Sequence, residues 1–61
     1  MARYWCHLLA NGSIGSVEKI DCDEDDEALR LARDLAANET VTGFELWRGL
    51  HLLHAESRTT H

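Results

Sequence analysis

The dipeptide Asn11-Gly12 is the sequence feature that most constrains how this chain folds, because strand-like runs lie on both sides of it. Both residues tolerate the positive φ that the two central positions of a type I′ turn require. Aromatic and apolar residues dominate 3–10, and a second short run covers 14–20. The N-terminal third of the chain therefore predicts a β-hairpin.

The second strand of this hairpin does not alternate strictly between apolar and polar residues. Its apolar residues Ile14, Val17 and Ile20 are spaced by three rather than by two. A β-bulge inserts one extra residue and resets the alternation, and an isolated glycine in a strand often marks one. We therefore expect a bulge at Gly15.

The hydrophobic period changes after this strand and becomes helical. Asp23 is a good N-cap residue, and Asp26 follows at the capping-box spacing. Together they predict a helix over about 24–37, and Asn38 suits the left-handed residue that ends a helix. The expected apolar stripe consists of Ala28, Leu31, Ala32, Leu35 and Ala36, widened by Leu29.

Two further strand-like runs, 44–47 and 50–55, flank the dipeptide Arg48-Gly49. A two-residue turn at this dipeptide, with Gly49 at positive φ, predicts a second hairpin. The pairing Trp47 with Leu50 then follows. One face would carry Phe44, Leu46, Leu53 and Ala55 beside His51, and the other would carry Trp47, Leu50 and Leu52 beside Glu45 and His54.

The predicted fold is α+β in the order ββαββ, with an antiparallel sheet of about four strands and one helix packed on one face. With 61 residues, the chain fits a single small domain, which we place at 1–56. The polar residues 57–61 are expected to form a disordered tail. A chain this short buries only about 60% of its unfolded surface, so its core is marginal without help from elsewhere.

One helix covers only one face of such a sheet, and the other face is also apolar. Its expected members are Trp5, Leu9, Trp47, Leu50 and Leu52. Large exposed apolar patches on small proteins usually mark interfaces, and tryptophan is enriched at interface hot spots. We therefore expect a homodimer or docking on a larger protein, with a sheet that curls around its own tryptophans as the alternative.

Acidic residues are concentrated at the expected helix start, and the net charge of the chain is −5. The acidic surface consists of Asp23, Glu24, Asp25, Asp26 and Glu27. Carboxylates in a first helical turn complement the helix dipole, which explains them without a ligand. A calcium loop is disfavoured because Asp26 stands where an EF-hand has glycine. No basic stripe for phosphate contacts is present, so we expect no nucleic-acid partner.

Cysteine and histidine residues offer a second hypothesis, a small-ligand or metal-responsive regulator. The residues concerned are Cys6, His7, Cys22, His51 and His54. Their spacing disfavours a zinc site, because adjacent residues on a strand point to opposite faces and zinc ligands usually come in closely spaced pairs. The expectation is no metal site, no cofactor and no catalytic residue.

The chain contains no apolar run near the ~20 residues that cross a membrane, and its start lacks the apolar region of a secretory signal. Two cysteines are fewer than small secreted scaffolds usually carry. We therefore expect a cytoplasmic protein with no membrane partner and with reduced thiols at Cys6 and Cys22.

Several short motifs resemble a group of very short alphaproteobacterial proteins of unknown function, found especially in rhizobia. The motifs are Arg3-Tyr4, Leu8-Leu9, Asn11-Gly12-Ser13-Ile14, Asp21-Cys22-Asp23, Glu27-Ala28, Ala32-Arg33-Asp34-Leu35 and Phe44-Glu45-Leu46-Trp47-Arg48-Gly49. The resemblance covers nearly the whole chain and implies a stand-alone bacterial cytoplasmic protein. It implies no activity and assigns no functional residue.

Overall fold

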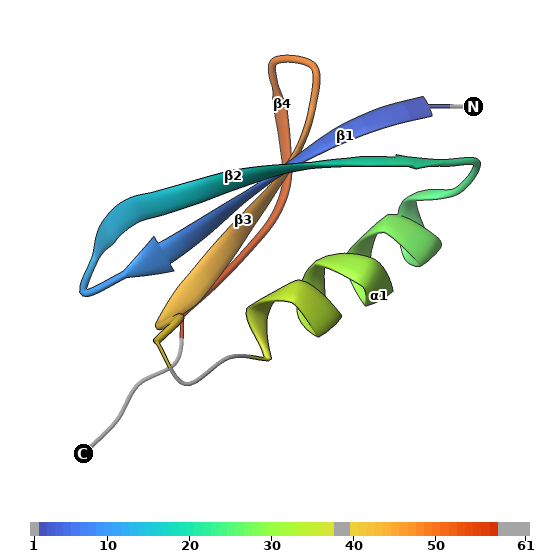
Figure 1. The fold of residues 1–61 in the computed structure, drawn as a ribbon. Coiled ribbons are helices and arrows are strands. Elements are labelled where there is room, and N and C mark those ends of the chain that lie inside the picture. The colour runs from blue at the N-terminus through green and yellow to red at the C-terminus, as the bar shows by residue number, and fades with distance from the viewer. Residues whose placement is uncertain (1, 38–39, 58–61) are drawn as a thin grey trace.

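The computed structural model describes residues 2–37 and 40–57, and it confirms the ββαββ order. The elements are β1 (Ala2–Ala10), β2 (Ser13–Cys22), α1 (Asp25–Ala36), β3 (Gly43–Arg48) and β4 (His51–Ser57). The strands form one antiparallel sheet in the order β2-β1-β3-β4. Helix α1 lies against one face of this sheet (Figure 1). Strand β4 ends at Ser57, and residues 58–61 of the predicted tail lie outside the described residues.

The first hairpin forms as its turn residues predict. Asn11 and Gly12 both have positive φ, 54° and 82°, as a type I′ turn requires. The pairing of β1 with β2 shifts register between Leu8 and Leu9, which leaves Gly15 as the extra residue on β2. The predicted bulge at Gly15 is therefore confirmed.

The second hairpin turns one residue later than predicted. Arg48 belongs to β3 and pairs with His51, so the two turn residues are Gly49 and Leu50. Gly49 has the expected positive φ, 61°. The guanidinium of Arg48 lies 3.6 Å from the carboxylate of Asp25 at the start of α1, a contact that favours continuing the strand. The predicted Arg48-Gly49 turn, and the pairing of Trp47 with Leu50, are wrong.

A second bulge, at Leu53, sets the faces of β4. Trp47 pairs with Leu52, whereas the preceding β3 residue, Leu46, pairs with His54. The extra residue reverses the alternation beyond it, so His54 shares the helix-covered face with Leu46. Ala55 consequently lies on the opposite face. The predicted faces of His54 and Ala55 were therefore wrong, whereas the predicted face of Leu52 is confirmed.

Helix α1 starts later than predicted and without the expected cap. Its N-cap residue is Glu24, so the assignment of this role to Asp23 was wrong, and within the described part of the chain Glu24 makes no side-chain capping hydrogen bond. The Cys22 thiol donates to the Glu24 carbonyl oxygen at 3.4 Å, which fixes the path from β2 into the helix. Three acidic residues occupy the first turn and complement the helix dipole. Asn38, the predicted terminating residue, lies outside the described residues.

The helix packs on the sheet mainly through its alanines, and Leu29 is partly buried beside them. Ala28, Ala32 and Ala36 are buried at four-residue spacing. Such small side chains let the helix backbone approach the sheet closely, and the bulky part of the core comes from the strands. The sheet side of the core contains Tyr4, Cys6, Ile20, Cys22, Phe44 and Leu46. Leu31 and Leu35 lie beside this contact and remain 36% and 38% exposed.

Candidate interaction surface

The open face, defined as the side chains of the sheet that point away from α1, follows from the strand registers. Tyr4, Cys6, Phe44 and Leu46 are buried under the helix, so their neighbours along β1 and β3 point to the other side. Residues paired across strands share a face. One cross-strand row contains Lys19, Trp5, Trp47 and Leu52, and the next contains Val17, His7, Glu45 and Ala55.

Large apolar side chains on the open face are substantially exposed. Trp5 is 38% exposed, Val17 45%, Leu52 48% and Ile14 56%. Trp5 and Leu52 lie in one row on either side of Trp47, and Val17 and Ile14 follow on β2 in the next two rows. A contiguous apolar patch of this kind is characteristic of an interaction site.

A small polar cluster occupies the centre of the open face. The indole N–H of Trp47 donates to Glu45 Oε1 at 3.2 Å. His7 Nδ1 lies 3.6 Å from the same oxygen and is buried, and it has no hydrogen-bond partner among the described residues. The rings of His7 and Trp47 stack with their centroids 5.8 Å apart. These contacts hold Trp47 against the sheet and leave Trp5 as the more accessible of the two indoles.

Four of the five predicted interface residues belong to the open face, namely Trp5, Leu9, Trp47 and Leu52. Leu50 does not, because the later turn places it at the tip of the β3–β4 hairpin, where it is 94% exposed. This hairpin tip projects beyond the rest of the sheet (Figure 1).

The sequence prediction missed the contribution of β2 to the open face. Ile14 and Val17 pair with Leu9 and His7, which places them on this face. The bulge at Gly15 makes the odd spacing of these two residues compatible with one face. The three-residue spacing of Ile14 and Val17 was therefore the available signal. It could be interpreted only once the pairing of β1 with β2 was known.

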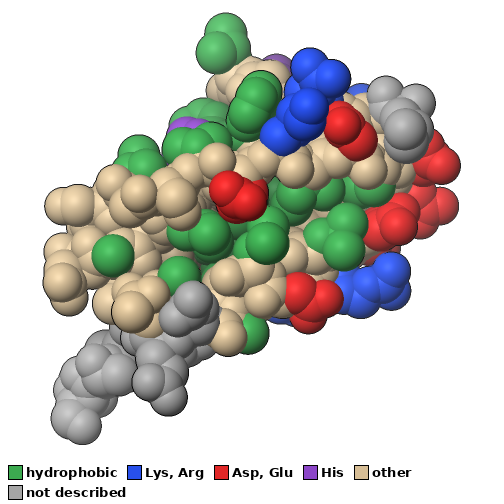
Figure 2. Space-filling model, in the orientation of Figure 1, with side chains coloured by type: hydrophobic (Ala, Val, Ile, Leu, Met, Phe, Trp, Pro, Cys, Tyr) green, Lys and Arg blue, Asp and Glu red, His purple; other side chains and the backbone are tan. Residues whose placement is uncertain are grey.

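A second apolar area lies between α1 and the edge strand β2. It is a groove of about 380 Å³ lined by Lys19, Ile20, Asp21, Leu31, Asp34 and Leu35. Figure 2 shows hydrophobic side chains between β2 and α1, with acidic side chains gathered where β2 passes into the helix. Edge strands that carry charged residues and a bulge are protected against pairing with another strand, and β2 has both devices.

The predicted acidic surface occupies the N-terminal end of α1, and one of its members has a structural role. The carboxylate of Asp25 accepts a hydrogen bond from the Tyr4 hydroxyl and lies near the Arg48 guanidinium. The hydrogen bond to Asp25, followed by burial, raises the pKa of Tyr4 to about 12. Asp25 thus links the helix start to β1 and β3.

The cysteine and histidine residues of the regulator hypothesis are not brought together. Cys6 is buried beneath the helix, His7 lies on the open face, and His51 begins β4. Burial raises the pKa of both thiols, that of Cys6 to about 11, so neither favours the reactive thiolate. Across 2–37 and 40–57, no three Cys, His, Asp or Glu side chains form a cluster able to hold a metal ion.

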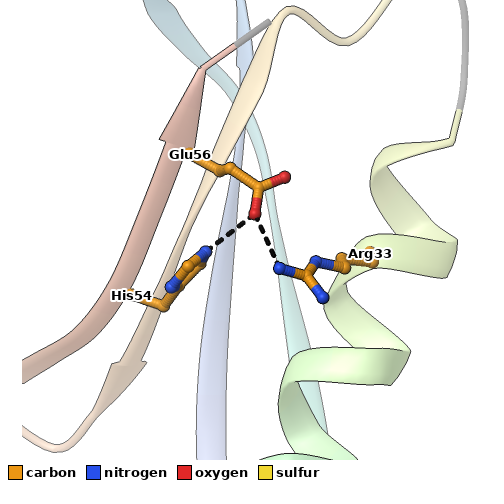
Figure 3. Close-up of polar contacts among 3 residues, drawn as sticks. All are labelled: Arg33, His54 and Glu56. Atoms are coloured by element: carbon orange, nitrogen blue, oxygen red, sulfur yellow. Dashed lines mark hydrogen bonds and ion pairs between the residues drawn. The ribbon is translucent and has the colours of Figure 1, made fainter.

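Glu56 links β4 to the helix through two donors (Figure 3). Its Oε1 lies 3.0 Å from Arg33 Nη2 on α1 and 2.8 Å from His54 Nε2 on β4. The hydrogen bonds from His54 and Arg33 lower the pKa of this carboxyl. They connect α1 to the outer strand β4 on the covered face.

The lowered pKa of Glu56 predicts an acid-sensitive contribution to stability. A carboxyl whose pKa is lower in the folded state stabilises the fold above its unfolded pKa of about 4.3, and this contribution is lost as pH falls through the folded pKa. We therefore expect the difference in unfolding free energy between the native chain and Glu56→Gln to shrink below about pH 4.3. Urea unfolding followed by circular dichroism at several pH values measures it. A difference that stays constant with pH would contradict the assignment.

No protein-family model, curated protein or solved structure matches this chain. Among the residues that the structure describes, no helix has the length and apolar character needed to cross a membrane. The functional proposal therefore rests on the geometry of the open face.

Proposed function

We propose that this protein is a non-enzymatic protein–protein interaction module whose open face docks on another protein surface. The observation that carries the proposal is the exposure of Trp5, Ile14, Val17 and Leu52 on one face of the sheet. A second copy of the chain or a larger protein would serve as the partner.

The energetics of a small domain support this proposal. Covering about 200 Å² of apolar surface stabilises an assembly by about 5 kcal/mol before the entropic costs of association. Small domains rarely obtain more than about 3–5 kcal/mol from one core, and oligomerisation is one natural remedy. Before the entropic costs of association are subtracted, the gain from covering the open face is therefore of the same size as the net stability of such a domain.

The polar groups and thiols support a docking role in a reducing compartment. Glu45 at the centre of the open face is engaged by Trp47 and lies near His7, so this cluster orients side chains within the patch. The two cysteines are free and buried, which suits the cytoplasm, where thiols stay reduced.

The proposal predicts that a charge at Trp5 strongly weakens association. We expect Trp5→Glu to weaken assembly about 30-fold, which corresponds to the ~2 kcal/mol of a hot-spot residue. Sedimentation velocity measures the mass of the chain, both pure and in an extract of its source cells. The native chain should sediment as more than a single chain in at least one of these solutions, and Trp5→Glu as a single chain in both.

Leu31→Glu is the matched control, because Leu31 is about as exposed as Trp5 but lies on the helix. This variant should associate as the native chain does. A native chain that sediments alone in both solutions would overturn the proposal. Loss of association in Leu31→Glu, with none in Trp5→Glu, would assign docking to the groove beside β2 instead.

A further inference from the structure

The occupant of the open face can be specified further, on the basis of the proposed function. We infer that it is a second copy of this chain, packed face to face about a two-fold axis that runs between the sheets and parallel to β1 and β3. The helices would then lie on the two outer sides of the assembly, because α1 covers the opposite face of each sheet (Figure 1).

Strand order determines what such an axis brings together. The order β2-β1-β3-β4 places the axis between the two central strands, so that each copy of β1 lies over β3 of the other copy. In the same way, β2 of one copy lies over β4 of the other. Residues of one cross-strand row face residues of the same row in the second copy, because rotation about this axis does not change the position of a residue along the strand direction. Trp5 therefore meets Trp47 of the second copy.

The polar side chains of the open face are complementary under this rotation. His7 lies on β1 and Glu45 on β3 in the same row, so each histidine meets the glutamate of the second copy. Around the axis, the two histidines then alternate with the two glutamates, and no carboxylate of these four side chains faces another. Lys19 meets the apolar Leu52 of the second copy, along which its aliphatic stem can pack.

The other in-plane two-fold axis, perpendicular to the strands, lacks this complementarity. It stacks each strand on the same strand of the second copy. If the axis crosses the strands at the Trp5 row, Lys19 meets Lys19 of the other chain; if it crosses at the His7 row, Glu45 meets Glu45. Such like-charge juxtapositions oppose association. Both axes keep the strands of the two sheets aligned, as in ordinary face-to-face sheet packing, so the side-chain pairs decide between them.

The size of the open face suits a weak dimer. Four strands about 4.8 Å apart and seven residues at about 3.3 Å per residue give a face of about 19 by 23 Å. Because side chains stand upright on the sheet, the accessible area of the face is larger than this projected area. It approaches the roughly 600 Å² per partner that the smallest specific interfaces bury. We therefore expect association in the micromolar range rather than a permanent dimer.

Disulfide trapping with two single-cysteine additions tests both the occupant and the axis. We expect an equimolar mixture of Lys19→Cys and Leu52→Cys, mildly oxidised, to give mixed disulfide dimers in at least about fivefold excess over either self-paired dimer. About the parallel axis, the two copies of either position stand at opposite edges of the assembly, three strand spacings or about 14 Å apart, so neither variant can bridge to itself within the dimer. The native chain, whose cysteines are buried, is the control.

The outcomes separate this inference from the proposed function. Preferential self-pairing of Lys19→Cys would overturn the parallel axis and favour the perpendicular one. A pure native chain that stays monomeric up to about 500 μM would overturn the second copy as occupant. The proposed function would survive that result if Trp5→Glu alone lost association in the cell extract. Should either cysteine variant misfold by circular dichroism, Val17→Cys with Ala55→Cys repeats the test in the next row.

Discussion

Replacing Leu46 with alanine is expected to remove most of the unfolding free energy of the protein at 25 °C. Leu46 is only 1% exposed and lies in the core between the sheet and the alanine face of α1. Truncating a buried leucine costs about 2–5 kcal/mol, because transfer energy is lost and a cavity remains. A domain of this size has about 3–5 kcal/mol in total. Urea unfolding followed by far-UV circular dichroism, below the concentration of association, measures the loss.

The same truncation on the open face is the matched control. Leu52 is 48% exposed and contributes little to the core of a single chain. We expect Leu52→Ala to change the unfolding free energy of the monomer by less than about 1 kcal/mol. Equal losses for the two variants would contradict the division of the sheet into a covered face and an open face.

Replacing Gly43 with alanine is the second change with a large expected effect. A Cβ atom at this position would lie 2.6 Å from the Glu56 carbonyl oxygen and 3.0 Å from Ser57 Cα. Both are backbone atoms of β4, so relief of the clash requires β3 and β4 to separate where they pair. We expect a cost of about 2–3 kcal/mol, typical of overpacking, and a clear fall in the unfolding midpoint.

Gly15→Ala provides the control for this second variant. A Cβ atom at Gly15 would meet the Cβ of Ala10 at 3.5 Å, an ordinary van der Waals distance. Its effect on the unfolding free energy should stay within about 1 kcal/mol. If Gly43→Ala proved as mild as Gly15→Ala, the close approach of β3 to β4 at this point would be wrong.

Local turn chemistry explains why the first hairpin could be predicted in detail. The Asn11-Gly12 turn and the Gly15 bulge each depend on residues whose backbone preferences are visible in the sequence. The second hairpin could not be predicted as well. Its bulge falls at Leu53, a residue type that gives no bulge signal, and this single insertion moved His54 and Ala55 to the faces opposite those predicted.

The helix illustrates a different limit. Periodicity identified the apolar side of α1, but it could not rank alanines against leucines as the contact with the sheet. Tyr4 and Phe44 supply bulky side chains from the strands, so the helix buries the small residues Ala28 and Ala32. That outcome depends on the space left between two elements far apart in the sequence.

The part of the candidate site that was predictable followed from the number of helix and sheet layers. One helix on a sheet leaves one face uncovered, and this argument correctly placed Trp5, Trp47 and Leu52 together. The contact between His7 and Glu45 was not predictable in the same way. It depends on β1 pairing with β3 across the helix connection, a non-local choice of strand order that no turn signal specifies.

The comparison of Trp5→Glu with Leu31→Glu tests the central claim, that the open face is a docking surface, most directly. The two side chains are similarly exposed and lie on different surfaces of the same small domain. Sedimentation of each variant beside the native chain should show association lost in Trp5→Glu and retained in Leu31→Glu. Association retained in Trp5→Glu, or a native chain that is single both in pure solution and in cell extract, would contradict the claim.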